Sequence, residues 1–347
     1  MMRTSLSACW LTLLLAGVAL AQDFPEKPPT PPLGLPKVFW PEDDAYSKHK
    51  AELGWLLYFD KRLSGDSSVS CASCHAPEKA FTDGQAVSIG IKGQKGGRSA
   101  PTVINRAYST LQFWDGRAES LEEQAKGPIA NPLEMTLEKE ADKAHEASVA
   151  RLKAVPGYVR RFKKVFESDK LDIDQVAKAI ATFERTIYSG NAPFDRYQEG
   201  DKKAMSEAQV RGMDVFYNKA TCDACHIGFN FTDGSFANIG IGMDKRGPDL
   251  GRYLVTGREE ERGAFKTPTL REIEHTGPYM HDGRFKTLEQ VIEHYDDGGI
   301  KNKYLDQRIK PLKLTKQDKS DLVAFLKALN GEGWRHVKEP TKEQLPR

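Results

Sequence analysis

Two short stretches decide the fold of this chain: CASCH at residues 71–75 and CDACH at residues 222–226. Each matches Cys-x-x-Cys-His, the attachment pattern of c-type haem. On a helical turn, two thiols three residues apart can each form a thioether with one porphyrin vinyl group, and the histidine that follows supplies an imidazole to the iron. The sequence therefore predicts two covalently bound haem c groups. The residues that attach them are Cys71, Cys74, His75, Cys222, Cys225 and His226.

Two other uses of the cysteines stand beside haem attachment. A zinc site would have to combine both pairs, but the pairs lie about 150 residues apart, far beyond the spacing of a zinc finger or ribbon. Two redox-active disulfides would leave the histidine of each motif unexplained. Haem attachment is the interpretation that uses all six residues.

An internal repeat accompanies the two motifs. CASCHAPEKAFTDG, from residue 71, resembles CDACHIGFNFTDG, from residue 222. PTVINRAYSTLQFWDGRAESLEEQ, from residue 101, resembles PTLREIEHTGPYMHDGRFKTLEQV, from residue 268. Aligned without a gap, the second pair sets Trp114 opposite His281 and Pro128 opposite Tyr295. Each half of the chain therefore looks like one haem-bearing unit.

The first 21 residues have the pattern of a cleavable secretory signal, with one positive charge, an apolar run and a final Ala-Leu-Ala. The apolar run is shorter than the ~20 residues of a membrane span, which disfavours an uncleaved anchor. Cleavage would remove Cys9 and place the mature protein in an oxidising space, the periplasm, with no membrane span. The formal net charge is +2 and the basic residues are scattered, so the sequence does not indicate a nucleic-acid partner.

The remaining length favours two domains. A proline-rich segment is predicted to form an extended lead-in on the surface. Amphipathic helical patterns cover residues 46–59, 138–155 and 173–187, and Thr315 and Asp318 begin a last strong helix. The prediction is a mainly α protein of two c-type cytochrome-like domains, one covalent haem in each, with long irregular loops. Its segments are 1–21 (signal), 22–44 (lead-in), 45–190 (the first half), 191–335 (the second half) and 336–347 (tail).

The order of motifs along the chain resembles that of the bacterial di-haem cytochrome c peroxidase and MauG family. After the first Cys-x-x-Cys-His come QFWDGRA at 112–118 and GPIANPLEM at 127–135, and after the second come KTPTL at 266–270 and PYMHDG at 278–283. The resemblance covers roughly residues 45–330. It implies a peroxidatic haem 1 in the first half and an electron-transfer haem 2 in the second.

The resemblance also implies roles for four residues near haem 1. Trp114 matches the tryptophan that lies between the haems and relays electrons, although packing in the core is its other role. Gln124, Pro128 and Glu134 match residues of the distal pocket. Proline has no atom that can bind iron, so the sixth position of haem 1 is expected to be open. Glu134 would move a proton between the peroxide oxygens and Gln124 would donate a hydrogen bond; the alternative for Glu134 is a solvated loop acid.

At haem 2 this chain departs from the ordinary peroxidases. Tyr295 stands where they have an axial methionine, and tyrosine at this position resembles MauG and the related MbnH enzymes, which oxidise protein residues. A tyrosinate ligand lowers the reduction potential of the haem. Met280 is the alternative ligand, and a packed aromatic is the other role of Tyr295.

A second departure concerns the loop that caps haem 1 in peroxidases that need prior reduction. No histidine occurs between His75 and His145, and Ile91 stands at the nearest match to the capping residue. Lys92 or Lys95 could take its place, but loop lysines are usually solvated. The sequence therefore argues against a reductive activation step.

The family resemblance implies a calcium ion between the domains. Its ligands include backbone oxygens that match Thr276 and Pro278. The side-chain ligand, an asparagine in the family, matches Ser99, which is a poorer oxygen donor for calcium.

Three functions follow from these features. The first is a peroxidase that reduces hydrogen peroxide with electrons from a small periplasmic cytochrome c or copper protein. The second is a MauG-like enzyme that uses the same oxidising chemistry on Trp or Tyr residues of a partner protein. The third is a plain di-haem electron carrier, which Pro128 disfavours because a carrier usually has a ligand on both sides of each iron. No motif identifies the partner.

Overall fold

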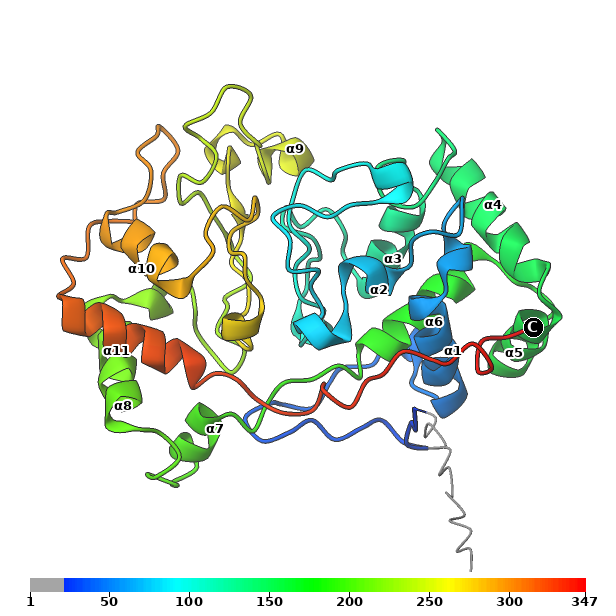
Figure 1. The fold of residues 1–347 in the computed structure, drawn as a ribbon, viewed down its shortest axis with the longest axis horizontal. Coiled ribbons are helices and arrows are strands. Elements are labelled where there is room, and N and C mark those ends of the chain that lie inside the picture. The colour runs from blue at the N-terminus through cyan, green and yellow to red at the C-terminus, as the bar shows by residue number, and fades with distance from the viewer. Residues whose placement is uncertain (1–21) are drawn as a thin grey trace, which may run out of the picture.

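The structure is a computed structural model that describes residues 22–347. The predicted secretion signal lies outside these residues. The chain is mainly helical, with 40% helix, and forms two lobes side by side (Figure 1). The first lobe contains α1 (Lys48–Phe59), α2 (Cys71–Cys74), α3 (Leu121–Ile129), α4 (Ala141–Lys153), α5 (Pro156–Phe166) and α6 (Ile173–Glu184). The rest of the chain forms α7 (Pro193–Gln198), α8 (Glu207–Asp214), α9 (Tyr253–Thr256), α10 (Leu288–Asp296), α11 (Lys316–Lys327) and the antiparallel strands β1 (Phe236–Ala237) and β2 (Phe265–Lys266).

Each half is built on a pair of helices that cross at a glycine. In the first half α1 packs on α6, and a Cβ atom at Gly54 would lie 1.8 Å from the carbonyl oxygen of Ala179. In the second half α8 packs on α11, and a Cβ atom at Gly212 would lie 1.8 Å from the carbonyl oxygen of Asp321. Only glycine allows backbones to approach this closely. The two halves thus repeat the same helix crossing as well as the same sequence motifs.

The four helical patterns predicted from the sequence are confirmed as α1, α4, α6 and α11. Thr315 caps α11 and its side chain accepts a hydrogen bond from the backbone N–H of Asp318, as the cap pattern predicts. Most ends differ by a few residues because helix ends depend on local capping and packing that periodicity does not encode.

The two ends of the described chain pack against the first half. Phe24 is only 3% exposed and lies against Trp55 and Phe183, so the proline-rich lead-in is not wholly on the surface as predicted. The segment after α11 runs back to the first lobe (Figure 1), where Trp334 and Val337 join its hydrophobic core. Both ends of the described chain therefore pack on the first lobe, although the second lobe lies between them in the sequence.

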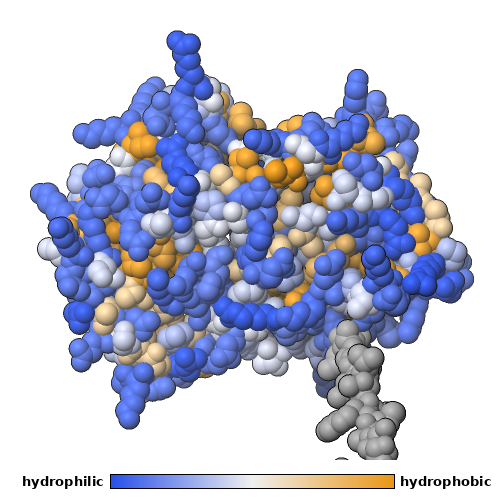
Figure 2. Space-filling model, in the orientation of Figure 1, coloured by the Kyte–Doolittle hydropathy of each residue, from blue (hydrophilic) through white to orange (hydrophobic). Residues whose placement is uncertain are grey.

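The surface in Figure 2 is largely hydrophilic, with small apolar patches between charged side chains. Within residues 22–347, no helix combines the length and the apolar character needed to cross a membrane.

Candidate haem sites and the junction between them

The first Cys-x-x-Cys-His motif lies on one short helix. Cys71 and Cys74 begin and end α2, and His75 follows directly. The Nδ1 atom of His75 lies 3.3 Å from the carbonyl oxygen of Phe81, and the hydroxyl of Tyr58 donates to the His75 carbonyl over 2.8 Å. Burial lowers the pKa of His75, which favours the neutral imidazole that binds metals. A carbonyl partner on Nδ1 orients the ring with Nε2 available to iron.

The second motif repeats this arrangement. Cys222 starts a single helical turn, and the Nδ1 atom of His226 lies 2.9 Å from the carbonyl oxygen of Phe231. Burial lowers the pKa of His226 as well. Phe81 and Phe231 occupy matching positions, each in the sequence FTDG. Both histidines are therefore held in the way that an iron ligand requires.

The residues present fit haem attachment better than the two alternatives. The four cysteines within residues 22–347 are unpaired, and burial raises the pKa of each thiol, to about 11 at Cys74 and about 12 at Cys222. Redox-active dithiols have lowered thiol pKa values instead. In the part of the chain that the structure describes, no group of three or more His, Cys, Asp or Glu side chains is placed to hold a metal ion, so zinc has no ligand set there.

A cavity of about 240 Å³ surrounds the second motif. Cys222, Cys225 and His226 line it, and so do Tyr295 from α10 and Met280 from the loop before it. Tyr295 lies close enough to both cysteines for their charges to act on its hydroxyl, and burial raises its pKa. The structure thus brings both candidate ligands of haem 2 into one cavity with the attachment site.

The two candidate ligands differ in how they are held. The Tyr295 hydroxyl has no hydrogen-bond partner within residues 22–347, whereas the carbonyl oxygen of Met280 accepts a bond from the Ser99 hydroxyl over 3.0 Å. The backbone of Met280 is also left-handed, with φ +74°. The hydroxyl of Tyr295 and the sulfur of Met280 both lack a protein partner in the described chain and both residues line the cavity, so both stay candidate ligands.

The predicted distal residues of haem 1 come from one continuous segment. Gln124 and Pro128 lie one turn apart on α3 and so share a face of that helix. Glu134 follows in the next loop, and its carboxylate accepts a 2.6 Å hydrogen bond from Asn131. The Gln124 side-chain amide has no partner in the described part of the chain, which leaves it free to donate.

The carboxylate of Glu134 is partly buried, and its charge contributes to the raised pKa of the Cys74 thiol in the first attachment motif. Burial raises the pKa of Glu134, and the charge of Arg117 and the Asn131 hydrogen bond offset this only in part. Glu134 is therefore a partly buried acid and not a fully solvated one.

The loop that would carry a capping histidine packs directly against the Glu134 segment. Ile91 is fully buried, and its backbone N–H donates to the carbonyl oxygen of Glu134 over 2.9 Å. Lys92 and Lys95 are exposed on this loop. The position that matches the capping residue thus serves as an apolar support for the distal loop.

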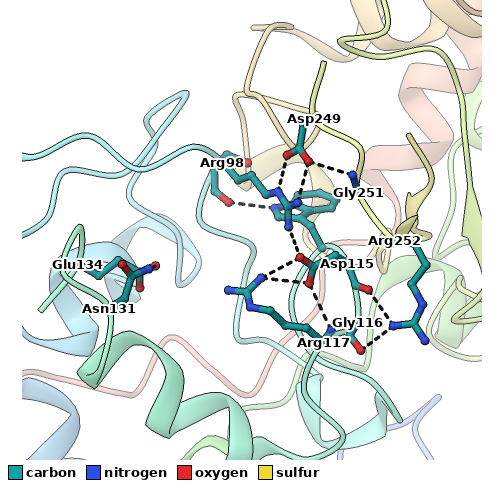
Figure 3. A network of polar contacts seen from close by, with 11 residues as sticks. Arg98, Asp115, Gly116, Arg117, Asn131, Glu134, Asp249, Gly251 and Arg252 are labelled. Carbon is teal, nitrogen blue, oxygen red and sulfur yellow. Dashed lines mark hydrogen bonds and ion pairs between the residues drawn. The ribbon is translucent and has the colours of Figure 1, made fainter. Parts of the chain in front are cut away.

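Trp114 lies at the junction between the two halves. Its indole Nε1–H donates to the carbonyl oxygen of Ser99 over 2.9 Å, and it lines the cavity of the second motif. The next residue, Asp115, accepts from Arg98 over 2.6 Å and from Arg117 over 3.0 Å (Figure 3). Figure 3 shows Arg98 reaching onward to Asp249 of the second half, while Glu134 lies to one side of this network.

The backbone around Trp114 follows the internal repeat. The N–H of Ser99 donates to the carbonyl oxygen of His281, and the N–H of Lys266 donates to that of Trp114, both over 2.8 Å. Ser99 matches Lys266 in the repeat, just as Trp114 matches His281. The halves therefore exchange equivalent hydrogen bonds, and Trp114 is fixed by both of them.

Calcium binding stays a prediction. Thr276, Pro278 and Ser99 line the same cavity wall, but the Ser99 hydroxyl donates to the Met280 carbonyl. No carboxylate, the usual strong ligand of calcium, was predicted for this site.

Several residues of the junction were not singled out from the sequence. They are charged or polar side chains, most of them in or near the quoted motifs, and the repeat alone does not reveal that the fold shields them from solvent, Lys266 almost fully and the others in part. These residues are Arg98, Arg106, Asn131, Asp249 and Lys266.

The chain is mainly helical, each half carries a Cys-x-x-Cys-His motif, and Trp114 lies where the halves meet. This combination is typical of cytochrome-like proteins. Residues 48–203 match the family described as "Di-haem cytochrome c peroxidase". The chain is 43% identical over 295 residues to "Methylamine utilization protein MauG" of Methylorubrum extorquens, with 84% of this chain and 81% of that protein covered. It is a member of the di-haem cytochrome c peroxidase and MauG family.

Other relatives do not separate the two branches of the family. The chain is 42% identical to "Cytochrome c551 peroxidase" of Nitrosomonas europaea, with 81% of this chain and 80% of that protein covered. The crystal structure of "a MauG-like protein associated with microbial copper homeostasis" superposes with a TM-score of 0.80 at 32% identity, over 94% of this chain and 99% of that one. Identity to a MauG protein and to a peroxidase is almost equal, so the site residues must decide between the functions.

Proposed function

We propose that this chain is a periplasmic di-haem c-type peroxidase that reduces hydrogen peroxide to water. The proposal assigns the peroxidatic haem to residues 45–190 and the electron-transfer haem to residues 191–335. A small periplasmic cytochrome c or copper protein would supply the electrons. The observation that carries the proposal is the partly buried carboxyl of Glu134, whose pKa is raised and whose charge acts on Cys74, in the loop just after Pro128, a residue with no atom that can bind iron.

Bound haem would supply the iron at which the oxygen–oxygen bond of hydrogen peroxide breaks and two electrons enter. Glu134 accepts the proton from one peroxide oxygen and returns it to the other, so that the leaving oxygen departs as water. Its raised pKa suits both halves of this transfer, because a carboxyl that is too acidic would not give the proton back. The Gln124 amide donates a hydrogen bond that orients the peroxide.

Trp114 links the two sites. Its ring reaches the cavity of the second motif, while its Nε1–H is bound to Ser99, next to the ion-paired Arg98. Because hydrogen bonds from both halves fix the residue, its ring has little freedom to move. A rigid aromatic side chain between the sites provides the route for electrons from haem 2 to haem 1.

A MauG-like activity on Trp or Tyr residues of a partner protein is the second candidate. The unpartnered hydroxyl of Tyr295 in the cavity of the second motif favours it, because tyrosinate stabilises oxidised iron. Both candidates use the same peroxide chemistry at the first site and differ in what is oxidised.

The proposal requires two covalent haems, because both attachment motifs are complete. The mass of the mature protein should equal the polypeptide plus two haem groups, and this mass should persist after denaturation in acid. One haem or none would contradict the architecture.

Trp114→Phe is expected to slow turnover with a reduced small cytochrome c as donor, while the first reaction with peroxide keeps its rate. Phenylalanine keeps an aromatic ring but loses the hydrogen bond to Ser99. Steady-state and stopped-flow measurements separate the two steps. Trp55→Phe is the matched control, because Trp55 is a buried tryptophan of the first core whose Nε1–H also donates to a backbone carbonyl, that of Lys338 over 2.8 Å, and it does not line the cavity. Wild-type turnover in Trp114→Phe would remove the tryptophan from the electron route.

A further inference from the structure

A buried lysine lies at the junction without a partner for its charge. Lys266 is only 7% exposed, and its backbone N–H donates to the carbonyl oxygen of Trp114. Its side chain lines the cavity that also holds Cys222 and His226. Within residues 22–347, its Nζ atom has no hydrogen bond and no ion pair.

A second cation, partly buried, lines the same cavity. The Arg106 guanidinium donates only to neutral acceptors: the Gln112 side-chain oxygen, over 2.6 Å and 3.1 Å, and the Leu111 carbonyl, over 3.3 Å. Its charge acts on Lys266 and on His75. Arg106 comes from the first half of the chain and, like Lys266, lines the cavity around the second attachment site.

The remaining charges nearby do not balance these two cations. Glu184 is the carboxyl whose charge acts on Arg106, but it makes no hydrogen bond or ion pair in the described chain. Burial raises the pKa of Glu184 to about 8, so it is mostly neutral at pH 7. Burial also lowers the pKa of Arg106 to about 10 and that of Lys266 well below its usual value.

The other buried cations within residues 22–347 are paired with carboxylates. The guanidinium of Arg271 is bidentate to Asp195, at 2.7 Å and 2.8 Å, and Arg185 pairs with Glu122 over 2.6 Å. A buried cation without a counter-charge is costly, and the cost is removed when an anion binds beside it. Lys266 and Arg106 thus mark a place for an anion that the polypeptide does not supply.

We propose that Lys266 and Arg106 form a carboxylate site that binds haem propionates at the junction between the two attachment sites. The inference rests on the haem attachment in the proposed function. Haem carries two propionate carboxylates, and the group attached at Cys222 and Cys225 would share its cavity with Lys266. Because Arg106 comes from the first half and Lys266 from the second, the propionates also tie the halves together beside Trp114. A free carboxylate from solution is the other source of the same chemistry.

The test is the reduction potential of each haem in the purified holoprotein, measured by spectroelectrochemistry. Lys266→Gln removes a buried positive charge, which favours the oxidised haem. We expect its one-electron reduction equilibrium to shift at least about tenfold toward the oxidised form, or about 59 mV to lower potential. Lys310→Gln is the matched control: Lys310 lines the same cavity but is exposed, so solvent screens its charge. Lys266→Arg should keep the wild-type potential.

Equal potentials in Lys266→Gln and Lys310→Gln would overturn the proposal. So would a shift of the wild-type potential on titration with sodium acetate, because that result would show a site filled from solution. If Lys266→Gln yields no holoprotein, a crystal structure of the wild-type holoprotein decides: a propionate oxygen within hydrogen-bond distance of Nζ supports the site, and propionates directed into solvent exclude it. None of these measurements depends on peroxide reduction. A failure of the proposed peroxidase function can therefore be distinguished from a failure of the propionate site.

Discussion

Glu134→Gln is expected to slow peroxide cleavage roughly 10²-fold or more while both haem spectra stay unchanged. The amide keeps the size of the side chain and can still bond to Asn131, but it cannot accept a proton and return it. Stopped-flow mixing with hydrogen peroxide measures this rate. Because burial raises the Glu134 pKa above its ordinary value of 4.5, the wild-type rate should fall on the acid side at a pH above that value, as the carboxylate becomes protonated. The variant should lack this limb of the pH profile.

Glu138→Gln is the control for this experiment. Glu138 is an exposed acid four residues further along the same loop, so the variant removes an equal charge without touching the buried carboxyl. It should react with peroxide like the wild type. If Glu134→Gln and Glu138→Gln have the same kinetics, the proton is moved by another group and the distal pocket has been placed wrongly.

Tyr295→Phe is expected to open the second haem. The wild-type ferric protein should contain one high-spin, five-coordinate haem and one low-spin haem with an oxygen ligand, whereas the variant should contain two high-spin haems. The physical reason is that phenylalanine fills the same space but has no oxygen to bind iron. Electron paramagnetic resonance of the fully oxidised protein counts both species.

Tyr279→Phe controls for the loss of a buried hydroxyl on the same cavity wall, and its spectra should match those of the wild type. If Tyr295→Phe also keeps the wild-type spectra, Tyr295 is a packed aromatic. Loss of the low-spin signal in Met280→Ala would then identify Met280 as the ligand.

The sequence predicted the attachment motifs because their chemistry is local. Cys71, Cys74 and His75 lie within about one helical turn, so their residue types and spacing alone identify the motif. The motif also occurs twice. The repeat went further, because its gapless alignment pairs Trp114 with His281, and these residues accept equivalent hydrogen bonds in the structure. The segment with Gln124, Pro128 and Glu134 came from family resemblance, and the structure adds the burial and the Asn131 contact.

The features missed from the sequence depend on contacts between distant segments. Phe24 lies in a proline-rich stretch, and only the groove beside Trp55 and Phe183 makes it a core residue. Lys266 and Arg106 carry charges that are usually solvated, so their burial follows from how the halves meet rather than from their neighbours in sequence. Composition and periodicity describe one segment at a time, so they do not predict contacts between segments that are distant in the sequence.

The position of Ile91 bears on whether the first haem needs reductive activation. Its buried side chain and its hydrogen bond to the Glu134 carbonyl hold the loop that would carry a capping histidine against the distal segment. The adjacent Lys92 and Lys95 are exposed, as expected for solvated loop lysines. The oxidised protein should therefore be ready to react.

The most direct test of peroxide reduction at the first site is to mix the fully ferric protein with one equivalent of hydrogen peroxide and no reductant. Peroxide loss and the absorption of both haems are followed together. We expect the peroxide to be consumed at once and the absorption of both haems to change, because the first site is open and Trp114 links it to the second. Reaction only after one-electron reduction would restore an activation step and exclude the MauG-like function. Peroxide that persists both before and after that reduction would show that the first site does not reduce peroxide.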